Sequence, residues 1–138
     1  MMDQDLKQNL SRSLLFIRLS VFLVMLMWTL DKFINVDHAK IVYEKFYYLS
    51  GFGNTVMYVF GGIELVFLLM FVVGYKKRYS YGLIFVLHLI STLSSFKQYL
   101  DPWKSLLFFA AWPMLAACYA LYVLRDYDTK CSLRSYEN

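Results

Sequence analysis

Residues 54–74 read NTVMYVFGGIELVFLLMFVVG, an apolar run in which Glu64 is the only charged residue. About 20 apolar residues in a helix cross the ~30 Å hydrocarbon core of a bilayer, and this run has that length. A soluble core does not need so long an uninterrupted apolar stretch. The run therefore predicts a transmembrane helix, and the rest of the chain is interpreted from it.

Three further apolar runs predict spans over about 13–34, 79–98 and 105–124. The whole chain is 59% hydrophobic and only 17% charged, whereas an average soluble domain carries about 25% charged residues. Its 138 residues suffice for one domain. We expect residues 1–138 to form a single integral membrane domain.

The links between the later runs are short. Only residues 75–78 separate the second run from the third, and residues 99–104 separate the third from the fourth. So short a link forces neighbouring helices to run antiparallel. The predicted fold is all-α, an integral membrane four-helix bundle with up-down-up-down order. Pro113 is expected to kink the fourth helix, because it leaves the carbonyl of Phe109 without its helical partner.

The first outer loop, residues 35–53, is the longest link. Within it Ala39, Val42, Phe46 and Leu49 recur at steps of three and four, which places them on one face of a helix. Several tyrosines lie nearby. We predict a short interfacial helix at the membrane surface.

Basic residues set the expected orientation. The side that holds both termini carries Lys7, Arg12, Lys76, Lys77, Arg78, Arg125, Lys130 and Arg134, and the other side carries Lys32, Lys40, Lys45, Lys97 and Lys104. The more basic side is normally cytoplasmic, so both termini are expected in the cytoplasm of a multi-pass inner-membrane protein. The net charge of +4 does not indicate nucleic acid, because the basic residues flank the apolar runs and form no continuous stripe.

Three ionisable residues fall inside the expected spans: Arg18, Glu64 and His88. A charge at the centre of a membrane helix costs about 2.5 kcal/mol or more. At 1.5 Å per residue, the backbone of Arg18 would lie roughly 8 Å deep and that of Glu64 roughly 15 Å, a gap that an arginine can close. We hypothesise an Arg18–Glu64 ion pair. The alternative is that Arg18 reaches the surface and Glu64 stays protonated.

His88 begins a polar stripe that continues with Thr92 and Ser95 at i+4 and i+7. Such a stripe is typical of a contact between membrane helices. Alternatively, His88 and Glu64 line a shared cavity that exchanges a proton or holds a polar head group. One histidine and one glutamate are too few ligands for a metal site.

Two residue pairs are further candidates for ligand contact. Gly61 and Gly62 precede Glu64 and allow either another helix or a flat ligand to approach the backbone. Lys32 and Lys97 close the outer ends of two spans. They either anchor helix ends in water or together attract an anion or an acidic head group.

These motifs resemble those of the DoxX-like family of small four-helix membrane proteins. The resemblance covers about Ile17 to His88 and rests on Arg18, Thr29, Lys32, Gly61-Gly62-Ile63-Glu64-Leu65, Gly74 and Lys76-Lys77-Arg78. It implies a four-helix inner-membrane fold with Arg18 and Glu64 in its polar core. The family is named for the small subunit of a thiosulfate:quinone oxidoreductase, so a redox role is an implication of the resemblance.

Three functions remain open from the sequence. The first is an accessory subunit of a quinone-linked redox system, in which Glu64 or His88 takes the quinone proton and Gly61-Gly62 admits the ring. No covalently bound cofactor is expected, so electrons would come from a membrane or redox partner protein. The second is a non-catalytic assembly or interaction subunit. The third is a small transporter, which would need to form a homo-oligomer because four helices make a thin wall.

Overall fold

The computed structural model describes residues 3–133, and every regular element in that range is a helix. The long helices are α1 (Gln4–Ile34), α3 (Asn54–Val72), α4 (Lys77–Ser94) and α6 (Ala111–Val123). The shorter elements are α2 (Val36–Tyr47), α5 (Phe96–Tyr99) and the 3-10 turns η1 (Pro102–Lys104), η2 (Leu106–Ala110) and η3 (Arg125–Tyr127). The prediction of an all-helical fold is confirmed.

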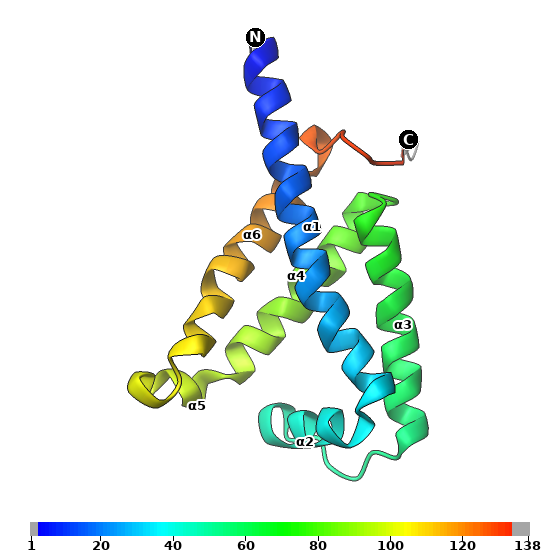
Figure 1. Ribbon diagram of the computed structural model, residues 1–138, viewed down its shortest axis with the longest axis vertical. Coiled ribbons are helices and arrows are strands. Elements are labelled where there is room, and N and C mark those ends of the chain that lie inside the picture. The colour runs from blue at the N-terminus through cyan, green and yellow to red at the C-terminus, as the bar shows by residue number, and fades with distance from the viewer. Residues whose placement is uncertain (1–2, 134–138) are drawn as a thin grey trace.

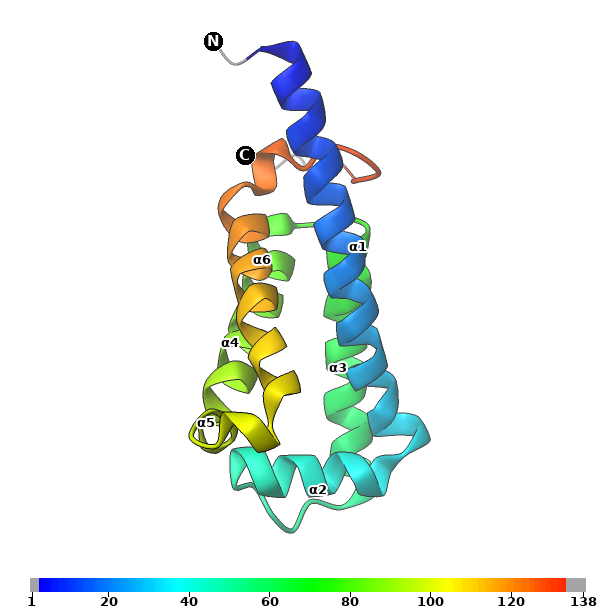
Figure 2. The same ribbon diagram turned by 60° about the vertical axis from the view of Figure 1, so that its left-hand side comes forward.

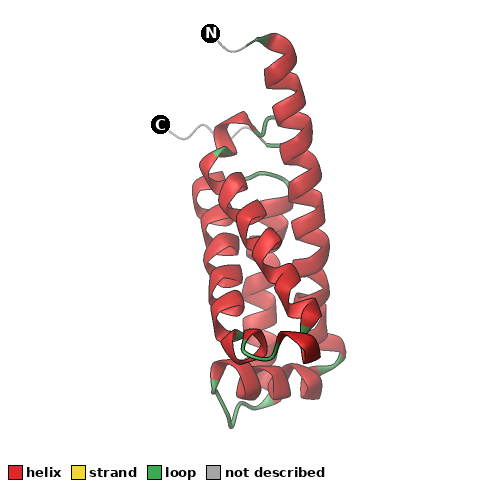
Figure 3. Cartoon of the chain, turned by 90° about the vertical axis from the view of Figure 1, so that its left-hand side faces the viewer, coloured by secondary structure: helices red, strands yellow, loops and turns green. Residues whose placement is uncertain are grey.

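The long helices lie side by side (Figure 3). Helix α1 packs against α3, α3 against α4, and α4 against α6, while α1 also contacts α6. The first residues of α1 project beyond the other helices at the end where η3 also lies, and we call this the terminal end (Figure 1). Helix α2 crosses the opposite end of the molecule, which we call the α2 end (Figure 2).

In the described part of the chain, three helical segments are long and apolar enough to cross a membrane: Gln4–Ile34, Asn54–Val72 and Leu106–Val123. The third expected span, 79–98, differs from the prediction. Its helix α4 begins with two basic residues, carries His88 and ends at Ser94. It is therefore less apolar than the three candidate spans and is not one of them. The hydroxyls of Ser94 and Ser95 both donate to the carbonyl of Ser91. Such bonds compete with the helical backbone ladder, which explains why the helix ends there.

The expected kink at Pro113 is also corrected. The stretch Leu106–Ala110 forms the 3-10 turn η2, and α6 begins only at Ala111. Pro113 therefore lies in the first turn of an α-helix, where a missing N–H removes no intrahelical bond. The proline starts a helix here and does not interrupt one.

The predicted helix in the 35–53 loop is present as α2. Ala39 is buried, and Val42 and Phe46 are half-buried, as one helical face requires. Leu49 lies outside the helix, which ends at Tyr47 and is followed by Tyr48 in a left-handed conformation with φ of 57°. The expected face is thus one residue shorter than the sequence pattern suggests.

The buried apolar core is small and lies towards the terminal end of the helices. It comprises Leu14, Val21, Met25, Leu68, Phe71, Tyr81, Ile84, Cys118 and Leu121. Large apolar side chains also cover the outer surface: Phe16 is 74% exposed, Leu23 59% and Leu107 90%. Many large exposed apolar side chains are typical of a surface that contacts membrane lipid or another protein.

Candidate functional site

The hypothesised Arg18–Glu64 ion pair is not formed. Arg18 pairs with Asp128 near the terminal end, and Glu64 pairs with Lys32 near the α2 end. Arg18 and Lys32 lie about four turns apart on α1, or about 21 Å at 1.5 Å per residue. Glu64 lies level with Lys32, so Arg18 cannot reach it. The interior therefore holds two separate polar clusters.

The terminal cluster consists of Arg18, Lys77, Tyr81 and Asp128. Arg18 Nη1 lies 3.2 Å from Asp128 Oδ2, and both side chains are fully buried. The same Nη1 donates to the hydroxyl of Tyr81 at 3.0 Å, and that hydroxyl donates to Asp128 Oδ2 at 2.7 Å. The three groups form a closed triangle, which offsets the cost of burying two charges.

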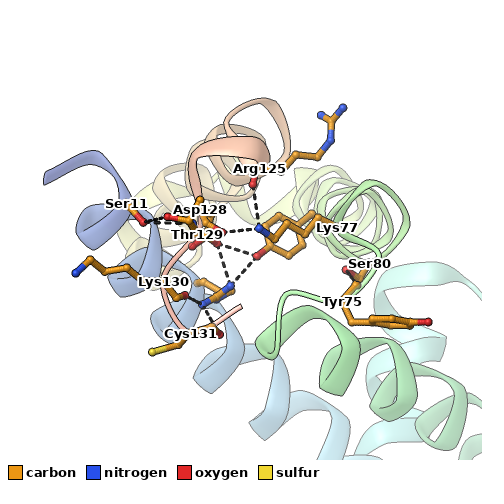
Figure 4. Close-up of polar contacts among 11 residues, drawn as sticks. Ser11, Tyr75, Lys77, Ser80, Arg125, Asp128, Thr129, Lys130 and Cys131 are labelled. Atoms are coloured by element: carbon orange, nitrogen blue, oxygen red, sulfur yellow. Dashed lines mark hydrogen bonds and ion pairs between the residues drawn. The ribbon is translucent and has the colours of Figure 1, made fainter. Parts of the chain in front are cut away.

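The cluster also binds the backbone of the chain that follows η3. Arg18 Nη2 donates to the carbonyls of Lys130 and Cys131 at 2.6 and 3.1 Å. The ammonium of Lys77 donates to the carbonyl of Asp128 (Figure 4). Two cationic side chains, one from α1 and one from α4, thus hold the end of the described chain in place.

Gly74 makes room for this arrangement. It has a φ of 65°, and a Cβ there would lie 2.8 Å from Arg18 Nη1 and 2.6 Å from Ser132 Cβ. Only glycine meets both the left-handed conformation and the close approach without strain. Beside it, the N–H of Leu133 donates to the carbonyl of Val73 at 2.8 Å. The α3–α4 link is therefore shaped to receive the segment after η3.

The α2-end cluster consists of Thr29, Lys32, Tyr43 and Glu64. Lys32 Nζ lies 2.8 Å from Glu64 Oε2, and Thr29 Oγ1 donates to Glu64 Oε1 at 3.1 Å. Lys32 Nζ also lies 5.8 Å from the ring centroid of Tyr43, on α2. Burial raises the pKa of the Tyr43 hydroxyl, and the nearby Glu64 carboxylate raises it further. The cluster joins α1, α2 and α3.

The two glycines before Glu64 have different surroundings. A Cβ at Gly61 would lie 2.8 Å from the Phe33 ring and 3.2 Å from Lys32 Cβ, whereas nothing lies within 4 Å of a Cβ at Gly62. Gly61 thus allows α1 and α3 to approach closely, and that approach places Lys32 beside Glu64. Gly62 faces open space.

His88 is not brought together with Glu64. Its Nε2 lies 3.1 Å from the carbonyl of Ala111, at the start of α6. The hydroxyl of Thr92 donates to the carbonyl of His88 at 2.8 Å, and Ser95 Oγ donates to a carbonyl one turn earlier. Of this stripe, His88 bonds to another helix, whereas Thr92 and Ser95 bond to the backbone of their own helix one turn earlier.

Lys97 does not join Lys32 in an anion site. Its Nζ lies 5.0 Å from the ring centroid of Tyr48, just after α2, while Lys32 is occupied by Glu64. Each lysine contacts a different tyrosine. Within residues 3–133, no group of three or more His, Cys, Asp or Glu side chains is arranged to hold a metal ion.

Two surface hollows of the described residues lie away from the expected site. One on the described part of the chain is lined by Gln4, Asp5, Lys7, Gln8, Ser11, Thr129 and Lys130, and another by Phe67, Arg78, Tyr79, Gly82, Leu83 and Val86. Neither includes Glu64 or His88. Within the α2-end cluster, Lys32 and Thr29 contact Glu64. The side chains of the α4 stripe bond to backbone carbonyls.

Sequence reasoning missed Asp128 and Tyr81. Asp128 follows the last apolar run in a polar tail, where an acidic residue is ordinary, and Tyr81 is one of twelve tyrosines. The sequence did indicate that a buried Arg18 needs an acidic partner, and that this partner must lie near the same end of the helices. Thr29 was marked only through the family resemblance, and Lys32 was marked through the resemblance and as a partner of Lys97; both contact Glu64 instead.

No protein-family model, curated protein or solved structure matches this chain. The class that the fold and the site define is correspondingly broad. Over residues 3–133 it is an all-helical protein with three segments long and apolar enough to cross a membrane and with two buried polar clusters.

Proposed function

We propose that this protein is a multi-pass inner-membrane protein that acts as a non-catalytic assembly or interaction subunit. One observation carries the proposal: Arg18 and Glu64, which the sequence offered as a functional pair, are each engaged by other groups of the same chain. Ion pairs of this kind fix the packing of helices. Neither Arg18 nor Glu64 is therefore left unpaired to act on a substrate.

In this proposal α1, α3, α4 and the η2–α6 segment cross the bilayer as an up-down-up-down bundle. The less apolar α4 is tolerated because His88 and Thr92 bond to backbone. Helix α2 lies at the outer membrane surface. Both termini are cytoplasmic, and the basic link at Lys76-Lys77-Arg78 supports this orientation. Arg134, also counted on that side, lies outside the described residues.

A stripe on α1 is the surface that we propose for the partner. Phe16, Leu19, Leu23 and Met27 recur at helical spacing and are 74%, 47%, 59% and 53% exposed. Lipid could cover this stripe, but a membrane partner helix would pack on it through the same van der Waals contacts. The experiment below distinguishes a partner helix on this stripe from lipid.

The test is native electrophoresis of the tagged protein from its own membranes in mild detergent. We expect a complex larger than the monomer that survives Lys32→Met with Glu64→Leu and is lost on Phe16→Ala with Leu23→Ala. Ile63→Ala with Val66→Ala, on an exposed part of α3, is the matched control. A monomer in all samples would contradict the proposal.

The quinone-linked role, and kinship with the DoxX-like family, stand as the second proposal. Their support is the Gly61–Glu64 motif and its contacts with Thr29 and Lys32. Extraction of the same purified material with organic solvent distinguishes the two. Quinone at about one equivalent, lost in Glu64→Gln, would favour the redox role over the assembly role.

A further inference from the structure

The terminal cluster surrounds a single carboxylate with donors from two different helices. Arg18 on α1 and Tyr81 on α4 both address Asp128 Oδ2, and a guanidinium beside a phenol is a strong donor set for a carboxylate. Both donors are fully or almost fully buried. Helices α1 and α4 both pack against α3, and Phe71 of α3 lies against the Tyr81 ring.

The carboxylate itself comes from a segment that is anchored in a different way. In residues 128–133 only Asp128 is buried, while Thr129, Cys131 and Leu133 are exposed. The segment is held through polar contacts, chiefly from Arg18 to its carbonyls and from the Leu133 N–H to Val73. It adds no side chain to the apolar core. The segment thus binds the helices much as a peptide ligand would.

The fit between Asp128 and its donors is incomplete. Asp128 Oδ1 and Arg18 Nε are both buried, and neither has a hydrogen-bond partner among the described residues. A carboxylate that is free to rotate can engage a guanidinium through two parallel bonds, which Asp128 does not do. Unmet buried donors and acceptors favour exchange of the occupant.

The α2-end cluster shows the contrast. Lys32 and Glu64 belong to α1 and α3, two long helices in contact along their length. They cannot separate without displacing a whole helix. Asp128 can leave when a few residues after η3 detach, and such local opening costs less than global unfolding.

We propose that Arg18 and Tyr81 form a carboxylate-binding site and that Asp128 is its tethered internal ligand. The segment after η3 is then a latch, and a small carboxylate occupies the site once Asp128 is withdrawn. This inference does not depend on the assembly role. It concerns a chemical preference of the terminal end that holds in detergent as well as in a bilayer.

The experiment removes the internal carboxylate and supplies an external one. Asp128→Gly, purified in detergent, is melted in sodium acetate and in sodium chloride of equal ionic strength. We expect a midpoint several degrees below wild type in chloride and a partial recovery in acetate. Asp126→Gly, which removes an exposed aspartate two residues away, should respond equally to both salts.

The recovery must depend on the donors. Tyr81→Phe combined with Asp128→Gly should lose the difference between acetate and chloride. Equal midpoints in both salts for Asp128→Gly would overturn the proposal, and so would a variant that fails to fold even in acetate. Folding only in acetate would support it.

Hydrogen exchange tests the latch separately. In Asp128→Asn we expect the exchange rate to rise much more at residues 129–133 than in α1 and α4. Loss of protection that spreads equally through α1 and α4 would show that Asp128 is a part of the core. That result would contradict its assignment as a displaceable ligand.

Discussion

The two buried ion pairs differ in what they connect. Lys32–Glu64 joins two adjacent long helices at the α2 end, whereas Arg18–Asp128 joins a long helix to the chain after the last one. The first pair is 7% and 14% exposed, and the second is fully buried. The comparison teaches that the burial of an ion pair does not determine how easily the segment that carries it can detach. The more deeply buried pair depends on the more detachable segment.

The largest expected effect comes from breaking the terminal cluster at its centre. Arg18→Met leaves Asp128 buried without a counter-ion and removes the donor to two backbone carbonyls. Loss of one partner of a buried pair costs about 3–5 kcal/mol. Unfolding in a denaturing-detergent titration should show a loss of that size. Arg12→Met, at an exposed position of the same helix, should leave the midpoint nearly unchanged.

A smaller effect is expected at the α2 end. Glu64→Gln keeps the shape of the side chain but removes the charge that faces Lys32. Because water reaches part of this pair and the amide still accepts from Thr29, we expect a loss of about 2 kcal/mol in the same titration. Glu44→Gln, on the exposed face of α2, is the matched control. A loss larger than that of Arg18→Met would reverse the comparison.

The neighbouring glycines sharpen the account of that end. Gly61→Ala places a methyl group 2.8 Å from the Phe33 ring, which must move, while Gly62→Ala meets nothing. Overpacking typically costs about 1–3 kcal/mol, and alanine recovers part of this through its helix propensity. We expect Gly61→Ala to be about 1 kcal/mol less stable than Gly62→Ala. Equal stabilities would mean that α1 and α3 are not in close contact there.

The smallest expected effect is a loss of folding stability at alkaline pH that is caused by Tyr43 at the α2 end. Burial raises the pKa of Tyr43 above its ordinary value of 10.0. The folded state therefore keeps a proton that the unfolded state loses, so this stability is present below about pH 10 and is lost as the pH rises further. Wild type should lose more stability than Tyr43→Phe between about pH 9 and about pH 11. Parallel curves for the two proteins would count against a buried Tyr43.

The sequence predicted the helical class well because hydrocarbon-length apolar runs have few alternatives. It also located the α2 helix, since Ala39, Val42 and Phe46 repeat with helical period. It misplaced the end of the third helix, which is Ser94, and it expected a kink at Pro113, which lies in the first turn of α6. Hydropathy alone does not register that the serines after Ser91 bond to backbone, nor that Pro113 suits a helix start.

The candidate site was predicted less well. Arg18 and Glu64 were correctly marked as buried charges that need partners, but the partners were wrong. The depth of Arg18 and Glu64 in the membrane was estimated by counting residues from the ends of the expected spans. Such a count cannot show that the segment after η3 folds back against Arg18. Asp128 reaches Arg18 because the chain after η3 folds back beside Gly74, where Lys77 donates to the Asp128 carbonyl.

Double-mutant cycles test the central claim, that the interior holds two independent ion pairs, most directly. Stabilities are measured for single and paired replacements at Arg18, Asp128, Lys32 and Glu64 in one detergent system. We predict coupling of about 1 kcal/mol or more for Arg18 with Asp128 and for Lys32 with Glu64, and additivity for Arg18 with Glu64. Strong coupling between Arg18 and Glu64 would contradict the account.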